Sequence, residues 1–436
     1  MKYRDLCAPV SVQLEVTEAC NLDCLHCYNH WRDKSKKYTP SRLNYKKINN
    51  IADLLIEAGV CSVTITGGEP LLFWRILPGA IQKMTSAGVD VGLNSNLSFL
   101  TDEIAASLKN SGLKRILVSV LSSREEVHDS ITGQKGSWQK TIAGIKKAKE
   151  FGFCVSSNTV LLKSNHQYLR ETAKFMKELG ISSFCATKAS PALNARDFAG
   201  LILSREELRA SLDELVGIKR ELGMEVDILE CYPLCLIGDI SKFSFFARRS
   251  CTAGVSSCTI GPTGDIRPCS HADMVYGNLF QEEFLKIWQK MSDWREARYI
   301  PDECQSCKFV GHCSGGCRME AKYYGNINGR DPFMTGQHDV NPSISASRVA
   351  GADFILPDGL KVNDSLKIRE ESFGATVSVY GKAIFINSDA MRILSELKTR
   401  KEFTAHSIIE EYGLKIEPAN RFLRSLLQNS IIQKSR

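Results

Sequence analysis

A regular alternation of short β-branched runs with amphipathic helical stretches constrains this chain most, and it extends from residue 10 to about residue 200. Strands that alternate with helices in this way pair in parallel through right-handed crossovers. A later helix begins at the capping box of Ser204 and ends at Gly223. We therefore predict an α/β fold, a partial (β/α)6 TIM-like barrel, with its chemistry at the C-terminal ends of the strands. The predicted strands are 11–16, 62–66, 90–94, 115–121, 153–160 and 182–188, and the predicted helices lie near 45–58, 77–87, 102–110, 137–151 and 167–179.

Three further segments follow the predicted barrel, which occupies residues 1–230. Residues 231–338 lose the alternation and are rich in Cys, Gly and Pro, which is typical of a domain held together by metal ligands. Residues 339–365 are predicted to be a linker. Residues 366–436 contain a predicted hairpin around Gly381-Lys382 and then three short helices, which indicates a small winged-helix-like domain. The three helices are predicted near 388–397, 404–412 and 418–428.

The composition excludes several classes of protein. The 436 residues include 56 Lys and Arg against 49 Asp and Glu, and a net charge of +7 over this length does not favour nucleic-acid binding. The chain has no apolar run long enough to span a bilayer and no signal-peptide pattern at its N-terminus, so we expect a cytoplasmic protein that does not bind membranes. Because thiols stay reduced in that compartment, the 16 cysteines suit metal ligation better than disulfide formation.

Three of these cysteines form the segment Cys20-x3-Cys24-x2-Cys27, directly after the first predicted strand. Three thiolates on a short loop suit a 4Fe–4S cluster whose fourth iron is open, whereas the alternative, a structural zinc site, needs a fourth ligand nearby. The second predicted strand ends in Gly67-Gly68-Glu69-Pro70. Its glycines let the backbone approach a ligand closely, and Glu69 can accept a hydrogen bond from an ammonium group. The two motifs together favour the iron–sulfur cluster.

With Tyr28 after the third cysteine, these motifs resemble the radical S-adenosylmethionine (radical SAM) superfamily over residues 11 to about 230. The resemblance implies that Cys20, Cys24 and Cys27 hold a [4Fe-4S] cluster whose open iron binds S-adenosyl-L-methionine. It further implies that reductive cleavage of this cofactor gives a 5′-deoxyadenosyl radical, which abstracts a hydrogen atom from the substrate. The implied cofactor-binding residues are Tyr28, Gly67, Gly68, Glu69, Pro70 and Ser119. Thr132 departs from the family, which often has an arginine at this position.

A second group of cysteines reads Cys251-x6-Cys258-x10-Cys269 and then Cys304-x2-Cys307-x5-Cys313-x3-Cys317. This spacing resembles the SPASM extension of radical SAM enzymes that process peptides and proteins. The resemblance implies two sets of ligands for auxiliary [4Fe-4S] clusters. The first set is Cys251, Cys258, Cys269 and Cys317, and the second is Cys304, Cys307 and Cys313. A zinc ribbon is the alternative for CxxC pairs of this kind.

The second auxiliary cluster lacks its usual last thiolate, because the family motif Asp-Pro-aromatic-Cys ends here in Met334. Three outcomes stay open: an iron open to substrate, ligation by Asp331, His338 or Asp339, or a site with fewer irons. The chain would thus hold one or two auxiliary clusters. Met334 is a weak ligand beside thiolates. We interpret the remaining cysteines as non-ligands, namely Cys7, Cys61, Cys154, Cys185 and the pair Cys231-x3-Cys235.

The C-terminal segment resembles the leader-binding domain of ribosomal-peptide pathways, akin to the peptide chaperone of pyrroloquinoline quinone biosynthesis. The resemblance is carried by residues 369–374, the hairpin end Phe385-Ile386-Asn387 and an apolar face with Phe422 and Leu426. A winged hairpin with an exposed edge can accept a peptide as an added strand. The alternatives are a structural cap and a DNA-binding winged helix. Residues 361–436 include 13 Lys and Arg against 9 Asp and Glu, a positive charge too small to favour DNA.

We therefore expect a radical SAM oxidoreductase that modifies a ribosomal precursor peptide by hydrogen abstraction and formation of a carbon–carbon, thioether or ether crosslink. The expected partners are the precursor peptide and a flavodoxin- or ferredoxin-type reductant. One alternative is an anaerobic sulfatase (formylglycine) maturase, but that family has a catalytic aspartate where Ser270 follows Cys269 here. A non-catalytic iron–sulfur electron carrier is the alternative from another class. Ser270 and His271 are further candidates for substrate contact.

Overall fold

The computed structural model describes residues 2–29, 39–191, 198–243, 249–336 and 356–435. Within these ranges the central sheet has ten strands in the order β10-β9-β8-β1-β2-β3-β4-β5-β6-β7. Strands β1 to β6 are the six predicted ones, and each pairs in parallel with the next. Their bounds are β1 Ser11–Glu15, β2 Ser62–Thr66, β3 Asp90–Ser95, β4 Arg115–Ser119, β5 Cys154–Leu161 and β6 Ser183–Lys188. The predicted partial barrel is confirmed.

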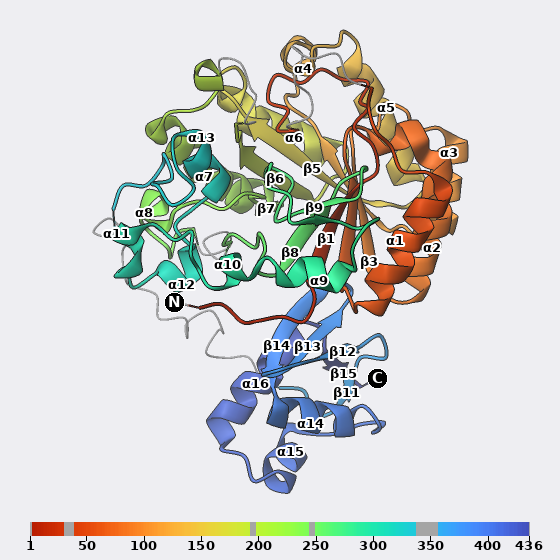
Figure 1. Ribbon diagram of the computed structural model, residues 1–436, viewed down its shortest axis with the longest axis vertical. Helices are drawn as coiled ribbons and strands as arrows, with labels where there is room; N and C mark the ends of the chain where they lie inside the picture. Colours follow the sequence, from red (N-terminus) through yellow and green to blue (C-terminus); the bar gives the residue numbers. More distant parts are fainter. Residues whose placement is uncertain (1, 30–38, 192–197, 244–248, 337–355, 436) are drawn as a thin grey trace.

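The helices between these strands cover the outer face of the curved sheet (Figure 1). Their inward stripe is apolar, as in α1, where Ile48, Ile51 and Leu55 are buried. One helix, α4, was missed by the sequence analysis because it is only eight residues long and ends at Gly133 in the left-handed conformation. The barrel helices are α1 Tyr45–Glu57, α2 Leu77–Ser86, α3 Asp102–Asn110, α4 Glu125–Thr132, α5 Ser137–Glu150, α6 Leu169–Glu178 and α7 Arg205–Leu222, with short 3-10 turns at Pro70–Ile76, His166–Tyr168 and Phe198–Gly200.

The cysteine-rich segment continues the barrel sheet and shares its core, a continuity that the boundary predicted between residues 230 and 231 did not anticipate. Strand β7 (Glu225–Asp227), the last strand of the predicted barrel segment, pairs with β6. Strand β8 (Ser257–Ile260), from the cysteine-rich segment, pairs in parallel with β1 at the other edge. Strands β9 (Asp265–Arg267) and β10 (Gly277–Asn278) follow antiparallel. A fully buried ion pair between Glu15 and Arg267 ties β1 to β9. The remaining helices here are α8 Leu234–Ile237, α9 Phe284–Gln289, α10 Ser292–Arg295, α11 Asp302–Gln305, α12 Val310–Cys313 and α13 Arg318–Tyr323.

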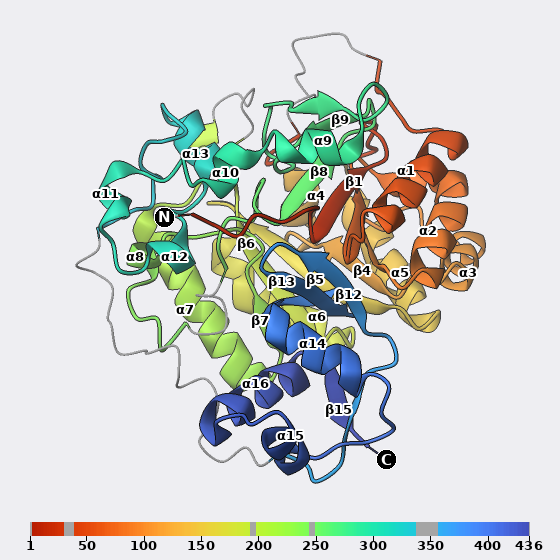
Figure 2. The same cartoon turned by 60° about the horizontal axis from the view of Figure 1, so that its bottom comes forward.

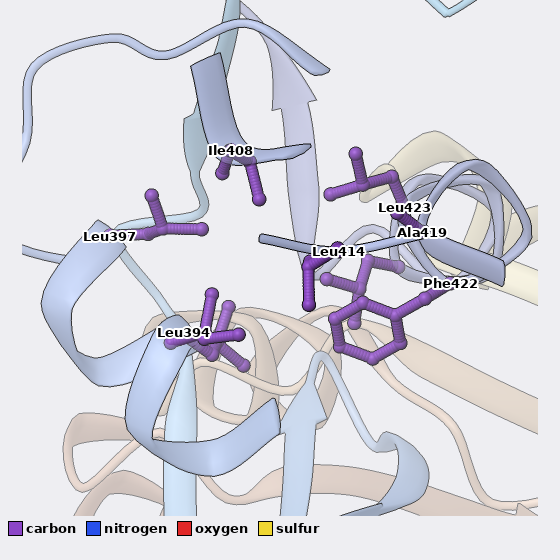
Figure 3. Close-up of a pocket in the computed structure, with 9 residues that line it drawn as sticks. Leu394, Leu397, Ile408, Leu414, Ala419, Phe422 and Leu423 are labelled. Atoms are coloured by element: carbon purple, nitrogen blue, oxygen red, sulfur yellow. The ribbon is translucent and has the colours of Figure 1, made fainter. Parts of the chain in front are cut away.

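The C-terminal unit has its own apolar core and its own sheets. Its hairpin turns at Tyr380-Gly381, where both residues have positive φ, and three helices follow as predicted. The predicted linker 339–365 is too long, because Leu360–Val362 forms strand β11 and pairs with β15. Figure 3 shows apolar side chains of the three helices around a small pocket. The elements are β11 Leu360–Val362, β12 Lys367–Glu371, β13 Gly374–Val379, β14 Lys382–Asn387, α14 Ser388–Leu397, α15 Ala405–Glu411, α16 Ile416–Gln428 and β15 Ile432–Lys434.

This unit packs against the N-terminal ends of the barrel strands (Figures 1 and 2). Arg369 on β12 donates hydrogen bonds to the carbonyl oxygens of Ala8 and Pro9, just before β1, at 2.8 and 2.9 Å, and to that of Gly59, just before β2, at 3.2 Å. The backbone N–H of Cys7 donates to Glu371 at 2.9 Å. The C-terminal unit therefore lies at the end of the barrel opposite to the C-terminal ends of the strands. Every helix in the described ranges is too short or too polar to cross a bilayer.

Candidate active site

A cavity of about 1370 Å³ opens at the C-terminal ends of the barrel strands, where the sequence analysis placed the chemistry. It brings together all the predicted residues of the radical SAM site except one. Pro70 is buried and begins the 3-10 turn behind the cavity wall. The predicted residues that line the cavity are Cys20, Cys24, Cys27, Tyr28, Gly67, Gly68, Glu69 and Ser119. Their proximity is what a shared cofactor site requires, while the role of each residue stays a prediction.

Close backbone packing holds the loop after β1 against the loop after β2. The N–H of Gly68 donates to the carbonyl of Thr17 at 2.7 Å, and the N–H of Glu69 donates to that of Ala19 at 2.8 Å. A side chain at position 68 would overlap the Ala19 carbonyl group. Gly67 has φ of +127°, which L-residues with side chains rarely adopt. The two glycines thus let the cysteine loop and the Gly-Gly-Glu loop lie in contact.

The Glu69 carboxylate is buried and held by its own chain. It accepts hydrogen bonds from the backbone N–H groups of Leu71 and Asn96, both at 2.9 Å, and from the Ser95 hydroxyl at 2.8 Å. Burial raises the pKa of Glu69, and these three hydrogen bonds oppose that shift. A carboxylate offers roughly four acceptor positions, so Glu69 keeps capacity for one further donor such as an ammonium group.

The end of α4 supports the cysteine loop from the other side. The backbone N–H groups of Asp23 and Leu25 donate to the carbonyls of Thr132 and Ile131, at 2.8 and 2.9 Å. The Thr132 hydroxyl lies 2.6 Å from that of Ser137, so this side chain, which replaces the arginine of the family, binds locally within the α4–α5 turn. Thr132 nevertheless lines the cavity, and its carbonyl helps to position the cysteine loop.

A second cavity, of about 660 Å³, adjoins the first and holds the predicted ligands of the first auxiliary cluster. Cys251, Cys258, Cys269 and Cys317 all line it. Cys231 lies among them, beside Cys251 and Cys317, although the sequence analysis set it aside. The Cys231-x3-Cys235 spacing was the available signal, but spacing alone does not reveal which cavity each thiol faces.

Ser270 and His271 stand between the two cavities and line both. The His271 ring lies 4.3 Å from that of Tyr28, and its Nε2 lies 3.7 Å from the Glu230 carboxylate. Ser270 hydrogen-bonds to Tyr28. The position after Cys269 therefore places a hydroxyl at this junction, where the sulfatase-maturase alternative requires a carboxylate.

A third cavity, of about 410 Å³, contains Cys304, Cys307 and Cys313, the three predicted ligands of the second auxiliary cluster. Cys235 and Met334 line the same cavity. Burial raises the pKa of Cys313, and the neighbouring Cys235 thiol raises it further. Asp331, one of the replacement ligands left open above, is fully buried and accepts hydrogen bonds from the N–H groups of Cys317 and Phe333, at 2.7 and 2.9 Å. His338 and Asp339 lie outside the described residues.

The three groups of cysteines suit iron–sulfur clusters. In a cubane cluster each thiolate binds a different iron, so the ligands surround a void. Each of the three groups lines a cavity of its own.

Lys188 is the main residue of the site that the sequence analysis missed. It ends β6, lines the first cavity, is 3% exposed and forms an ion pair with Glu320 of α13. Its Nζ lies 5.6 and 5.4 Å from the ring centroids of Tyr232 and Phe333. Burial disfavours the charged amine, but Glu320 raises the pKa of Lys188 well above its usual value. The sequence could have indicated Lys188, because it stands at the C-terminal end of a predicted barrel strand, where active-site residues lie.

Comparisons with known proteins agree with this geometry. The model of the radical SAM superfamily matches residues 14–176, and that of the SPASM iron–sulfur cluster-binding domain matches residues 251–308. These two domains imply S-adenosylmethionine, the radical SAM [4Fe-4S] cluster and auxiliary clusters as cofactors.

Several relatives are similar over most of their length. AdoMet-dependent heme synthase of Oleidesulfovibrio alaskensis is 25% identical over 352 residues, which cover 76% of this chain and 88% of that protein. Mycofactocin maturase MftC of Mycobacterium tuberculosis is 28% identical over 359 residues, covering 79% and 87%. The crystal structure of Streptococcus suis SuiB bound to precursor peptide SuiA superposes with a TM-score of 0.60 at 18% identity, covering 74% and 75% of the two chains. The chain therefore contains a radical SAM domain, over residues 14–176, and a SPASM iron–sulfur cluster-binding domain, over residues 251–308.

Proposed function

We propose that this protein is a radical SAM maturase that modifies a ribosomally synthesised precursor peptide by oxidative crosslinking. The observation that carries the proposal is the single cavity that joins the three cysteines of the first loop, the Gly-Gly-Glu loop and Ser119. It opens through Ser270 and His271 toward the first auxiliary cavity. A maturase similar to this chain, MftC, and the similarity to SuiB with its bound precursor peptide support a peptide as the substrate.

The residues of this chain have separate tasks in the proposed reaction. Cys20, Cys24 and Cys27 hold the radical SAM cluster, which together with S-adenosylmethionine supplies a 5′-deoxyadenosyl radical that removes one hydrogen atom from the peptide. Glu69 would accept a hydrogen bond from the cofactor's ammonium group. Ser119, at the end of β4 in the same cavity, would contact its ribose.

The crosslink requires the loss of a second electron and a proton from the peptide radical. Residues of the first auxiliary cavity lie beside the active cavity, so an auxiliary cluster held there can take this electron. Its ligands would be Cys251, Cys258, Cys269 and Cys317. A flavodoxin- or ferredoxin-type protein would supply the electron that starts each turnover. We place the reaction in the cytoplasm, because these thiolates need a reducing compartment.

The C-terminal unit favours a peptide over a heme precursor as the substrate. In the described residues β14 pairs only with β13, so it leaves one edge on which an extended leader peptide can add as a strand. Beside the sheet, α14, α15 and α16 pack around the apolar core of the unit, with Phe422 at its edge (Figure 3). The core holds the edge strand in place, and hydrogen bonds from the peptide backbone supply affinity in this mode of binding.

The first experiment measures both products of the reconstituted, reduced enzyme with S-adenosylmethionine and a candidate precursor. We expect 5′-deoxyadenosine and a precursor lighter by the mass of two hydrogens. Cys24→Ala should abolish both products and leave precursor binding unchanged. Cys61→Ala is the matched control, because this buried thiol lies outside the three cavities. Product formation by the Cys24→Ala variant would refute the proposal.

A second experiment tests the leader-binding role by deleting residues 356–436 from the chain. Precursor affinity should fall, while slow cleavage of S-adenosylmethionine without peptide should persist, because Arg369 of the deleted unit bonds to the barrel at the end opposite to the cavity. Titration of the labelled leader peptide measures the affinity, and chromatography measures 5′-deoxyadenosine. Leader affinity equal to that of the full chain would contradict the role.

A further inference from the structure

We propose that Cys235 is the fourth thiolate ligand of the second auxiliary cluster and replaces the cysteine that the chain lacks at Met334. The proposal rests on the cluster-binding role inferred above and concerns only which residues hold the cluster. It also implies that the site has no iron left open for substrate. The second auxiliary cluster would then transfer electrons or stabilise the fold.

Cys235 lies in the same cavity as the three predicted ligands of the second auxiliary cluster. Cys235 belongs to the four-residue helix α8, whereas Cys304 belongs to α11 and Cys313 to α12. These segments converge on one cavity, which Cys307 also lines. Cys235, Cys304 and Cys313 are each less than a tenth exposed. Four thiols that line one cavity are the donor set that a cubane cluster requires.

Backbone N–H groups point at the sulfur atoms of Cys235 and Cys313. The N–H of Thr335 points at Cys235 Sγ at 3.4 Å, and the N–H of Leu234 points at Cys313 Sγ at 3.3 Å. The Thr335 hydroxyl also donates to the Cys235 carbonyl at 2.8 Å, which fixes the two segments together. Hydrogen bonds to sulfur stabilise cluster thiolates and tune their reduction potential. The chain thus supplies these bonds to Cys235 as it does to a predicted ligand.

The other described residues near this cavity are unsuited to be the fourth ligand of the cluster. Met334 is 3% exposed and lines the cavity, but its thioether is a weak ligand beside thiolates. Asp331 is absent from the cavity wall, and its carboxylate accepts hydrogen bonds from Cys317 and Phe333. Cys231 faces the neighbouring cavity with Cys251 and Cys317.

The local sequence explains why Cys231 and Cys235 serve different cavities. Pro233 between them has extended backbone and precedes α8, which ends at Gly238 with φ of +71°. The change from extended to helical backbone turns the chain between the two cysteines. The segment from Cys231 to Cys235 therefore passes between the two auxiliary cavities, with one thiol in the wall of each.

The test uses the full chain with Cys20, Cys24 and Cys27 changed to Ala, so that only the auxiliary clusters contribute to the spectra. In this background we compare Cys235→Ala with the control Cys61→Ala after identical anaerobic reconstitution. Cys235→Ala should lose up to about four irons per chain, or should show on mild oxidation the electron paramagnetic resonance signal of a 3Fe–4S cluster that the control lacks. Iron content and spectra equal to those of the control would overturn the proposal.

A rescue variant keeps the test decisive if Cys235→Ala binds little iron because it folds poorly. Adding Met334→Cys to Cys235→Ala restores a thiol at the position that the family uses, in the same cavity. We expect this double variant to recover the iron content and to lose the 3Fe–4S signal. Failure of the rescue would overturn the proposal. Neither readout depends on a peptide substrate, so the result is independent of the maturase assignment.

Discussion

At the scale of single residues, the active site depends on groups that position the cofactor loops as much as on the cysteines. Gly68 lets the two loops touch because it has no side chain, and Glu69 joins the end of β2 to the end of β3 by accepting hydrogen bonds from Ser95 and Asn96. The sequence predicted both residues as cofactor contacts. Only the structure shows that a side chain at position 68 would overlap the Ala19 carbonyl group.

We predict that Gly68→Ala weakens the binding of S-adenosylmethionine. The added methyl group overlaps the Ala19 carbonyl and pushes the loops apart, a strain of about 1–3 kcal/mol. This strain corresponds to an affinity roughly tenfold to hundredfold lower, measured by anaerobic equilibrium dialysis. Gly92→Ala is the control, because a methyl group there lies 3.6 Å from its nearest neighbour. An unchanged dissociation constant for Gly68→Ala would show that the loops do not need this contact.

We also predict that His128 makes the protein less stable as the pH falls. Burial lowers the pKa of His128 to about 4, against 6.5 in the unfolded chain, so the unfolded state binds more protons between these values. The free energy of unfolding should decrease by about 1.4 kcal/mol from about pH 7.5 to about pH 5.5 through this residue. His128→Asn keeps an acceptor for the N–H of Leu121. In this variant the free energy of unfolding, measured by urea denaturation, should fall less as the pH is lowered. If His128→Asn and the unchanged protein show the same pH dependence of stability, His128 is not the cause of the decrease.

Among the helices and strands, the sequence predicted those whose pattern of apolar residues or capping residues is local. Strands β1 to β6 and the capping box of α7 are local patterns, and the structure confirms them. The pairing of β8 with β1 and the approach of Cys235 to Cys304 were not predicted, because they join segments far apart in the chain. Loop cysteines carry no periodicity that could reveal such contacts.

The contact between β6 and α13 gives a prediction at this scale. Lys188→Met should destabilise the protein by about 3–5 kcal/mol, because it leaves Glu320 buried without its counter-charge. The double variant Lys188→Met, Glu320→Gln should lose less stability than Lys188→Met alone. The urea midpoint of the anaerobic protein measures the stability of both variants. Lys286→Met, which breaks an exposed ion pair with Glu283, is the control and should change stability by less than about 1 kcal/mol. A loss for Lys188→Met as small as that of the control would contradict the buried pair.

At the scale of the whole molecule, the leader-binding edge and the active cavity lie at opposite ends of the barrel. The C-terminal unit contacts the segments before β1 and β2, whereas the cavity lies where the strands end. A six-residue strand spans about 20 Å, and an extended chain covers at most about 3.6 Å per residue. A precursor bound at both places must therefore be long enough to cross the barrel.

We predict a minimum spacer of about six residues between the leader and the modified residue of the precursor. Precursors shortened below this length should keep their affinity for the enzyme but lose modification. Mass spectrometry of a series of spacer deletions measures the modification, and titration measures affinity. Full modification of a precursor without a spacer would contradict the placement of the C-terminal unit as the leader-binding site.

Transfer of deuterium from a deuterated precursor to 5′-deoxyadenosine would show directly that the enzyme abstracts a hydrogen atom from the peptide. We expect the reduced, reconstituted enzyme to form deuterated 5′-deoxyadenosine together with a crosslinked precursor. We expect Cys24→Ala to form neither product. If the enzyme is supplied with its precursor and forms only unlabelled 5′-deoxyadenosine while the precursor stays unchanged, the result would contradict hydrogen abstraction from the peptide.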